Sequence, residues 1–381
     1  MGQKRRQSGI RKQRFHTRLE NSFDCLFGWS RSQFPCRALA KAKINSMRTV
    51  LFYRTFRKFH GGHLKVWDYF NHVLASPEFT PRIEFSPKSN WDRTNPWWDA
   101  REYVVDPRRS APPDTLLGRF KVAWREYVGD SRRSMRPDVF FVAGRDWLML
   151  DQHPDAGADI PVVNLVQHVR HADPKSTRFE FLSRKAIRIC VSEEVAQALR
   201  ETGLTQGPLI VIPNGLDLES LPASSDGARD VDVLIVALKQ PDLGEALERR
   251  LKQPDRRIDV LSKRLSRPEF MSRIQGAQTT VFLPNKTEGF YLPALEGMAL
   301  GTLVVCPDCV GNRSFCLPGY NAFRPNYAFE ELVRAAESAL TLAPDQAQQI
   351  CANARQTAEA HSLLRERQAF LDVLRNIDQL W

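Results

Sequence analysis

The sequence contains no run that approaches the roughly 18 uninterrupted apolar residues of a membrane-spanning helix. It also contains no charged N-terminal stretch followed by a continuous apolar core, so a secretory signal is not predicted. Its seven cysteines are odd in number and follow no regular spacing, which argues against a disulfide framework. Together these absences predict a cytoplasmic protein with reduced thiols.

The sequence also lacks the motifs of a dinucleotide-binding site and of a zinc site. No G-x-G-x-x-G follows an apolar run, which argues against a dinucleotide-dependent oxidoreductase. Cys306, Cys309 and Cys316 form a close group, but no histidine near them could complete a zinc site. Ordinary cysteines at a strand end and in a loop explain this group better. We therefore expect no bound metal and no cofactor.

The formal net charge of +11 by itself favours nucleic-acid binding. Residues 1–46, however, hold 11 lysines and arginines and two acids, so nine of the eleven net charges lie in this stretch. The remaining chain is nearly neutral, and no nucleic-acid partner is predicted. Met47 stands directly before an apolar run, so residues 1–46 form a basic extension, either disordered or the product of an upstream start. The alternatives are a transit-like peptide and an arm that contacts anionic membrane lipid, at about 1 kcal/mol for each basic residue.

Short apolar runs alternate with helical patterns along the rest of the chain. Such alternation is typical of parallel sheets with helices on both faces. The runs form two sets, parted at residues 213–217, which predicts an α/β fold with two Rossmann-like domains and a cleft between them. We expect the domains at 47–215 and 216–360 and a terminal helix at 361–381. The predicted strands are 49–53, 83–85, 138–143, 160–166, 186–191, 209–212, 231–238, 258–261, 279–283 and 302–306.

Glu288 and Glu296 are the most informative pair of residues. Seven residues separate them, which places Glu288 in a loop after an apolar run and Glu296 about one turn into a helix, so both can face one ligand. Pro293 suits the first helical position and Gly301 the position just past the end, which predicts a helix over about 293–300. Free N–H groups at the start of this helix would attract phosphate, while the carboxylates suit the hydroxyls of a sugar or ribose.

This segment resembles the glutamate motif of retaining, nucleotide-sugar-dependent glycosyltransferases of the GT-B fold, most closely that of glycosyltransferase family 4. The resemblance covers about residues 47–381. It implies that Glu288 lies against the donor hexose at the reaction centre and that Glu296 binds the donor ribose. It also implies an acceptor-binding N-terminal domain, a donor-binding C-terminal domain and a last helix that crosses back onto the first domain. The loop residues implied to meet the hexose and the diphosphate through their backbone amides are Gly289, Phe290, Tyr291 and Leu292.

Three further positions gain a role from the resemblance. Gly62 lies in a Gly-Gly turn before a helix, where the family loop covers the donor phosphates or the acceptor, and a purely structural turn explains it nearly as well. His168 follows an apolar run of the first domain and matches a histidine near the family's reaction centre, with His171 as a second candidate. Lys239 stands in for an arginine that neutralises the donor diphosphate.

The chain departs from the family pattern at two points. Tyr291 occupies a position that is often glycine in the family loop. No basic residue stands at the position of the family's second diphosphate-binding cation, and leaving-group stabilisation is usually a large electrostatic contribution. Lys263, Arg264 or Arg313 could compensate for the missing cation.

The resemblance implies an enzyme that moves a hexose-type sugar from a nucleoside diphosphate sugar to a glycan or glycolipid acceptor, with retention of configuration and without a bound metal. The alternative, favoured by the missing cation, is a catalytically weak or inactive GT-B protein that binds nucleotide sugar. Residues 86–136 would supply the acceptor loops, where aromatic rings suit a sugar, although core packing explains at least two of the four tryptophans there equally well. The tryptophans in these loops are Trp91, Trp97, Trp98 and Trp124.

Overall fold

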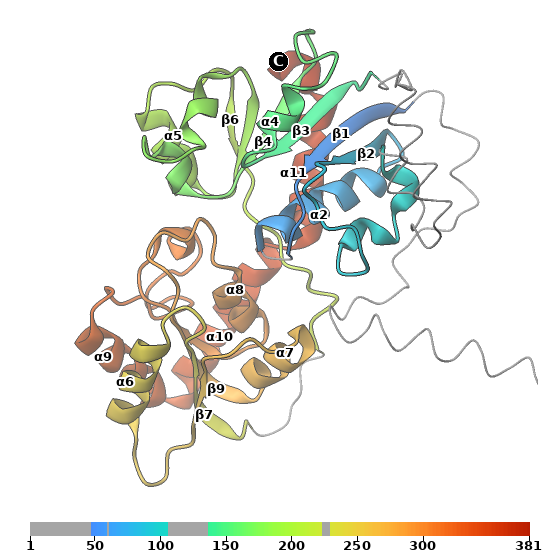
Figure 1. The fold of residues 1–381 in the computed structure, drawn as a ribbon. Helices are drawn as coiled ribbons and strands as arrows, with labels where there is room; N and C mark the ends of the chain where they lie inside the picture. The colour runs from blue at the N-terminus through green and yellow to red at the C-terminus, as the bar shows by residue number, and fades with distance from the viewer. Residues whose placement is uncertain (1–46, 59–60, 106–135, 223–228) are drawn as a thin grey trace, which may run out of the picture.

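The structure is a computed structural model that describes residues 47–58, 61–105, 136–222 and 229–381. These residues form two α/β domains, each built around a parallel sheet (Figure 1). The predicted basic extension, residues 1–46, lies outside the described residues. In the described ranges, no helix is both long enough and apolar enough to cross a membrane.

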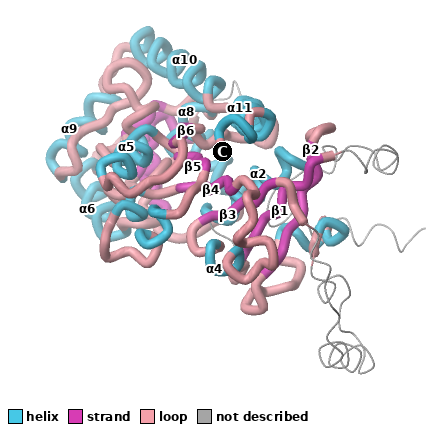
Figure 2. Tube along the Cα trace, turned by 90° about the horizontal axis from the view of Figure 1, so that it is seen from above, coloured by secondary structure: helices cyan, strands magenta, loops and turns pink. Residues whose placement is uncertain are grey.

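The N-terminal domain has a six-stranded parallel sheet in the order β2-β1-β3-β4-β5-β6 (Figure 2). Its central strands are buried on both faces, as a sheet covered by helices requires. Val50 and Phe52 of β1 belong to the core on one face, while Leu51 and Tyr53 belong to the core on the other. The elements are β1 (Arg48–Arg54), α2 (Gly61–Leu74), β2 (Phe79–Phe85), η4 (Pro96–Trp98), η5 (Arg101–Tyr103), β3 (Val139–Ala143), α4 (Trp147–Leu150), β4 (Val162–Val166), η7 (Val169–Ala172), η8 (Phe179–Ser183), β5 (Ile187–Cys190), α5 (Glu193–Glu201) and β6 (Leu209–Val211).

The C-terminal domain has a four-stranded parallel sheet in the order β10-β9-β7-β8. Val233 and Ile235 of β7 pack with α6 and α9 on one face, and Leu234 and Val236 pack with α7, α8 and α10 on the other. Each of the ten predicted strands overlaps an observed strand, and the predicted helix at 293–300 is observed one residue earlier. The elements are β7 (Val231–Val236), α6 (Pro241–Leu251), β8 (Ile258–Leu261), α7 (Arg267–Gln275), β9 (Ala277–Phe282), α8 (Leu292–Ala299), β10 (Leu303–Val305), η9 (Val310–Asn312), α9 (Phe329–Leu340), α10 (Pro344–Ala360), α11 (Leu363–Arg375) and α12 (Ile377–Leu380).

The end of the chain returns to the N-terminal domain. Helix α10 packs within the C-terminal domain, whereas Phe370 and Leu374 of α11 belong to the core of the N-terminal domain. Figure 1 shows α11, in red, within the N-terminal domain, and the ring of Phe370 lies 4.6 Å from that of Tyr69 in α2. Arg375 at the end of α11 also pairs with Glu78, which precedes β2, at 2.7 Å. The expected crossing of the last helix onto the first domain is confirmed.

Two chain segments connect the domains, and they pair with each other. The N–H of Leu216 donates to the carbonyl of His361 at 2.8 Å, and the N–H of Leu363 donates to the carbonyl of Leu216 at 2.8 Å. A Cβ at Gly215 would stand 2.6 Å from the Cα of Leu363, so the close approach of the two segments requires glycine there.

Glu366 of α11 anchors this crossing against α2. Its side chain is buried and accepts hydrogen bonds from the N–H of Gly215 and from Nζ of Lys65, the latter at 2.6 Å. Nε2 of His72 lies 3.2 Å from its other oxygen. Burial alone would raise the pKa of Glu366, but the charge of Lys65 and the contact with His72 bring it below its usual value. Glu366 is therefore a buried carboxylate that ties the connecting segments to the N-terminal domain.

Candidate functional site

Glu288 lies in the loop after β9, at the carboxyl edge of the C-terminal sheet. Its N–H donates to the carbonyl of Asn285 at 3.2 Å, and its Oε1 accepts a hydrogen bond from Nδ2 of Asn285 at 3.2 Å. The same oxygen contacts the ammonium of Lys239, which follows β7. Because β7 and β9 are adjacent and parallel, both residues leave the sheet at one edge. The structure thus brings together, as an ion pair, the predicted catalytic carboxylate and the predicted diphosphate-binding cation.

Gly289 brings this loop into contact with the N-terminal domain. A Cβ at this position would stand 2.0 Å from the carbonyl oxygen of Gln167 and 3.0 Å from the Cα of His168. On the other side of the loop, a Cβ at Gly311 would stand 2.8 Å from the carbonyl oxygen of Glu288. The loop is therefore held between two stretches of backbone, and only glycine fits at position 289.

His168 follows β4 at the carboxyl edge of the N-terminal sheet. Its Nδ1 accepts a hydrogen bond from the N–H of Arg170 at 3.0 Å, so the neutral ring carries its proton on Nε2. Burial and the charge of Arg170 lower the pKa of His168 to about 4, against an opposing effect of Glu288. His168 is therefore a neutral hydrogen-bond donor at neutral pH. Burial, followed by the charge of Arg178, lowers the pKa of the alternative candidate, His171, to about 3.

Gly62 is the second residue of α2. Its carbonyl oxygen accepts hydrogen bonds from Nε2 of Gln167 at 3.2 Å and from Nη2 of Arg54 at 3.4 Å. Gln167 thus connects the start of α2 to the point where Gly289 meets the N-terminal domain. The predicted site residues Gly62, His168, Lys239, Glu288 and Gly289 therefore gather where the carboxyl edges of the two sheets meet.

Glu296 lies about one turn into α8 and is 4% exposed. Its Oε1 accepts a hydrogen bond from Nη1 of Arg267 at 2.7 Å. Arg267 is the first residue of α7, 29 positions earlier in the chain, and the sequence carried no signal that would pair the two. Arg267 and Gln167 are the site residues that the sequence did not reveal.

The side chains between Gly289 and α8 anchor the loop in the domain. The ring of Phe290 lies 5.1 Å from that of Phe315, and the ring of Tyr291 lies 6.2 Å from that of Phe282. Tyr291 is 4% exposed, so this tyrosine, at a position predicted from the resemblance to be often glycine, packs into the core. Leu292 is partly buried against the same core. A contact of these residues with a ligand would therefore use their backbone, as the resemblance implies.

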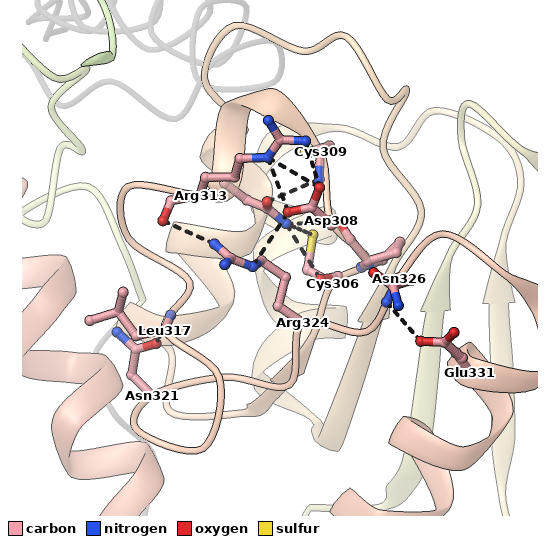
Figure 3. Close-up of polar contacts among 11 residues, drawn as sticks. Cys306, Asp308, Cys309, Arg313, Leu317, Asn321, Arg324, Asn326 and Glu331 are labelled. Carbon is pink, nitrogen blue, oxygen red and sulfur yellow. Dashed lines mark hydrogen bonds and ion pairs between the residues drawn. The ribbon is translucent and has the colours of Figure 1, made fainter. Parts of the chain in front are cut away.

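The candidates for the missing second cation differ in their surroundings. Arg313 is bound to Asp308 through two nitrogens, at 2.6 and 3.1 Å, and Asp308 also pairs with Arg324 (Figure 3). Lys263 and Arg264 follow β8 and are exposed. Because β8 is adjacent and parallel to β7, these two residues share the sheet edge from which Lys239 projects. Their position makes them better candidates than Arg313.

The cysteine group lies beside the candidate site. Cys306, Cys309 and Cys316 are all buried, and burial raises the pKa of Cys306 well above its usual value. Sγ of Cys306 accepts a hydrogen bond from Nδ2 of Asn312 at 3.1 Å, in the loop drawn in Figure 3. Among the described residues, no group of three or more His, Cys, Asp or Glu side chains is placed to hold a metal ion.

The tryptophans expected in the acceptor loops have different environments. Trp97 is fully buried in the N-terminal core, with its ring 5.1 Å from that of Trp67. Trp91 and Trp98 are partly buried, and their rings lie 5.4 Å apart. Trp124 lies outside the described residues. Core packing therefore accounts for Trp97, while Trp91 and Trp98 keep some exposed surface.

Comparison of the sequence with protein-family models and with curated proteins gives no match. The fold, in contrast, matches solved structures over most of the chain. Sucrose-phosphate synthase from Thermosynechococcus elongatus has a TM-score of 0.63 at 13% identity, over 87% of this chain and 99% of that chain. Anabaena HepE in complex with UDP and glucose has a TM-score of 0.62 at 14% identity, over 86% and 100%. A glycosyltransferase from Rickettsia africae has a TM-score of 0.63 at 14% identity, over 87% and 98%. The chain therefore has the GT-B fold, with two Rossmann-like domains, which its sequence predicts.

Proposed function

We propose that the protein is a glycosyltransferase, similar to family 4, that moves a hexose-type sugar from a nucleoside diphosphate sugar to a glycan or glycolipid with retention of configuration. The main support for this proposal is that Glu288, Lys239 and His168 lie close together where the two domains are in contact. Ligands of open parallel sheets bind outside the carboxyl ends of the strands, and two such edges meet at this point. Solved structures of the same fold contain UDP and glucose or UDP-glucose, which supports a nucleotide sugar as the donor.

In this proposal the C-terminal domain binds the donor. Glu288, positioned by Asn285, lies against the hexose, and Glu296, positioned by Arg267, binds the ribose. The backbone N–H groups at the start of α8 and the ammonium of Lys239 stabilise the negative charge that develops on the diphosphate. Lys263 or Arg264 supplies the second cation from the neighbouring strand, so the leaving group is stabilised without a bound metal.

His168 contributes from the N-terminal domain. With its pKa at about 4, its ring is neutral and offers the Nε2 proton to the hexose or to the leaving group. Retention follows from a same-face displacement, in which the leaving phosphate takes the proton of the acceptor hydroxyl. We place the enzyme in the cytoplasm, and residues 1–46 can hold it to an anionic membrane surface.

A second candidate function is a GT-B protein that binds nucleotide sugar without turning it over. Both glutamates already hold cationic partners, Lys239 with Glu288 and Arg267 with Glu296, and the second cation of the family pattern is absent from its usual position. A donor must displace or share these partners before reaction. A protein in which the ion pairs persist would bind the donor and leave it intact.

A mass-spectrometric screen of the common nucleotide sugars separates these functions. We expect slow hydrolysis of one donor by the full-length protein and a measurable affinity for that donor by isothermal titration calorimetry. Binding without hydrolysis, and without transfer to any offered glycan or glycolipid, would favour the binding protein. Failure of every nucleotide sugar to bind would refute both functions.

A further inference from the structure

Three arginines lie near His168 at the carboxyl edge of the N-terminal sheet. Arg145 follows β3, Arg170 lies in η7 after β4, and Arg178 precedes η8. Because β3 and β4 are adjacent and parallel, the first two leave the sheet at the same edge. A Cβ added to Gly144 would lie 3.8 Å from Nε of Arg178, so Arg178 lies close to the residue that precedes Arg145. We refer to Arg145, Arg170 and Arg178 as the arginine cluster.

No described carboxylate neutralises the arginine cluster. Asp146 is buried, and its Oδ2 accepts hydrogen bonds from Nη1 of Arg54 at 2.8 Å and from the N–H of Ala143 at 3.2 Å. Arg54 in turn donates to Nδ1 of His63 at 2.8 Å. Within the described ranges, no ion pair or side-chain hydrogen bond engages the guanidinium groups of the cluster. Asp146, which is already paired with Arg54, therefore offsets the three positive charges of the cluster only in part.

These charges lie close enough to repel one another. Burial, together with the charges of Arg170, Arg145 and Arg54, lowers the pKa of Arg178 below its usual value. Arg145 and Arg170 are exposed, and Arg178 is partly exposed, so all three can reach a ligand. Guanidinium groups match the oxygens of phosphate in geometry and charge, and a phosphate monoester carries about −1.5 to −2 at pH 7. One phosphate would thus offset about half to two thirds of the charge of the three arginines.

We propose that the arginine cluster binds a phosphate group of the acceptor. This inference rests on the proposed glycosyl transfer and narrows the acceptor to a glycan or glycolipid that carries phosphate near the accepting hydroxyl. The cluster belongs to the N-terminal domain, whereas Glu288, Lys239 and α8 belong to the C-terminal domain. The charges of Arg170, Glu288, Arg178 and Lys239 all act on His168, which places this residue close to both sets of groups. A phosphate on the cluster would therefore lie on the acceptor side of the reaction centre.

Calorimetric titration of the full-length protein with inorganic phosphate tests the site. The protein is first saturated with the nucleoside diphosphate of the donor found in the screen, so that the donor's phosphate positions are filled. We expect phosphate to bind the wild type and Arg170→Gln to weaken its affinity by about tenfold or more. Arg178→Lys, which keeps the charge but loses the planar fork, should weaken it less. Arg334→Gln, an exposed arginine of α9 in the C-terminal domain, is the matched control and should bind phosphate as the wild type does.

A transfer assay completes the test. With the identified donor, we expect the wild type to glycosylate hexose 6-phosphates in preference to the same hexoses without phosphate, and Arg170→Gln to lose the preference. Absence of phosphate binding to the saturated wild type, or equal transfer to both acceptor sets, would overturn the proposal. Weaker binding of the nucleoside diphosphate itself to Arg170→Gln would assign the cluster to the donor and overturn it as well. If no nucleotide sugar binds, the proposed function fails, and phosphate binding alone would not restore an acceptor role.

Discussion

Replacement of Gly289 by alanine tests whether the contact between the domains builds the site. The new Cβ would stand 2.0 Å from the carbonyl oxygen of Gln167, 2.8 Å from its carbonyl carbon and 3.0 Å from the Cα of His168. All three are backbone atoms, so no side-chain rotation can relieve the clash. Ordinary contact begins at 3.4 Å, so the oxygen and the Cβ must separate from 2.0 to 3.4 Å, a shift of about 1.4 Å. This shift would move Glu288 away from His168.

The damage should appear in turnover rather than in folding. Each domain has its own hydrophobic cores, and Gly289 belongs to none of them, so the melting temperature should stay near that of the wild type. Misplacement of reacting groups by about 1 Å can cost about 10²-fold in rate. We therefore expect kcat/KM for the nucleotide sugar to fall about 10²-fold, which corresponds to about 2.7 kcal/mol of transition-state stabilisation.

The assay is the initial rate of nucleoside diphosphate release, with thermal melting followed by circular dichroism. Gly157→Ala is the matched control, because a Cβ at Gly157 meets nothing within 4 Å and the residue precedes β4, at the opposite end of the strand from His168. A Gly289→Ala protein with wild-type kcat/KM would refute the reasoning. A large drop in its melting temperature would show instead that the contact stabilises the domains themselves.

The remaining predictions concern the carboxylates, metal, pH and the basic extension. Glu288→Gln should abolish transfer with the fold intact, whereas Glu296→Gln should raise the donor Kd more than it lowers kcat; wild-type rates in purified Glu288→Gln would contradict the assignment. Activity should survive EDTA, because cationic side chains and the start of α8 are available to the phosphates; loss on chelation that one divalent ion restores would argue against the proposal. Since the folded pKa of His168 is about 4, below the usual value, its contribution to stability should be full above about pH 6.5 and decline as pH falls toward 4, and His168→Asn should reduce this decline in melting experiments. A form that begins at Met47 should keep donor hydrolysis but not sediment with anionic liposomes at low salt as the full-length protein does; equal sedimentation of both would rule out the basic arm as an anchor.

The sequence predicts the parts of the fold that depend on short stretches of neighbouring residues. Runs such as 231–238 and 279–283 become β7 and β9 because a strand buried on both faces must be apolar along its whole length. The glutamate motif is likewise local, because a loop and one helical turn position both carboxylates. The bounds of α8 follow from Pro293 and from Gly301, whose φ of 72° suits glycine.

The parts that the sequence does not reveal depend on contacts between distant residues. Lys65 and Glu366 are 301 positions apart, and neither has a neighbour in the sequence that marks it as half of a buried pair. In the sequence, Gly289 cannot be distinguished from other loop glycines. Only the structure shows that the backbone of Gln167 lies too close to it for any side chain. Arg267 is one of many arginines, and only the pairing of α7 with α8 gives it a role. Gly289 gains its role from the contact between the domains, and the other residues gain theirs from the packing of helices that are distant in the sequence, neither of which local patterns encode.

The two ion pairs at the site explain how the protein can tolerate its carboxylates without a ligand. Glu288 is only partly exposed and Glu296 is buried, and a buried carboxylate without a partner costs several kcal/mol. Lys239 and Arg267 offset this cost. In the proposed reaction, the arrival of a diphosphate gives Lys239 a stronger anionic partner, so its ammonium can turn toward the phosphates while Glu288 turns to the hexose hydroxyls. The ion pair is thus exchanged for two new contacts, and the additional negative charge that the diphosphate brings is the reason that a second cation, Lys263 or Arg264, is needed beside Lys239.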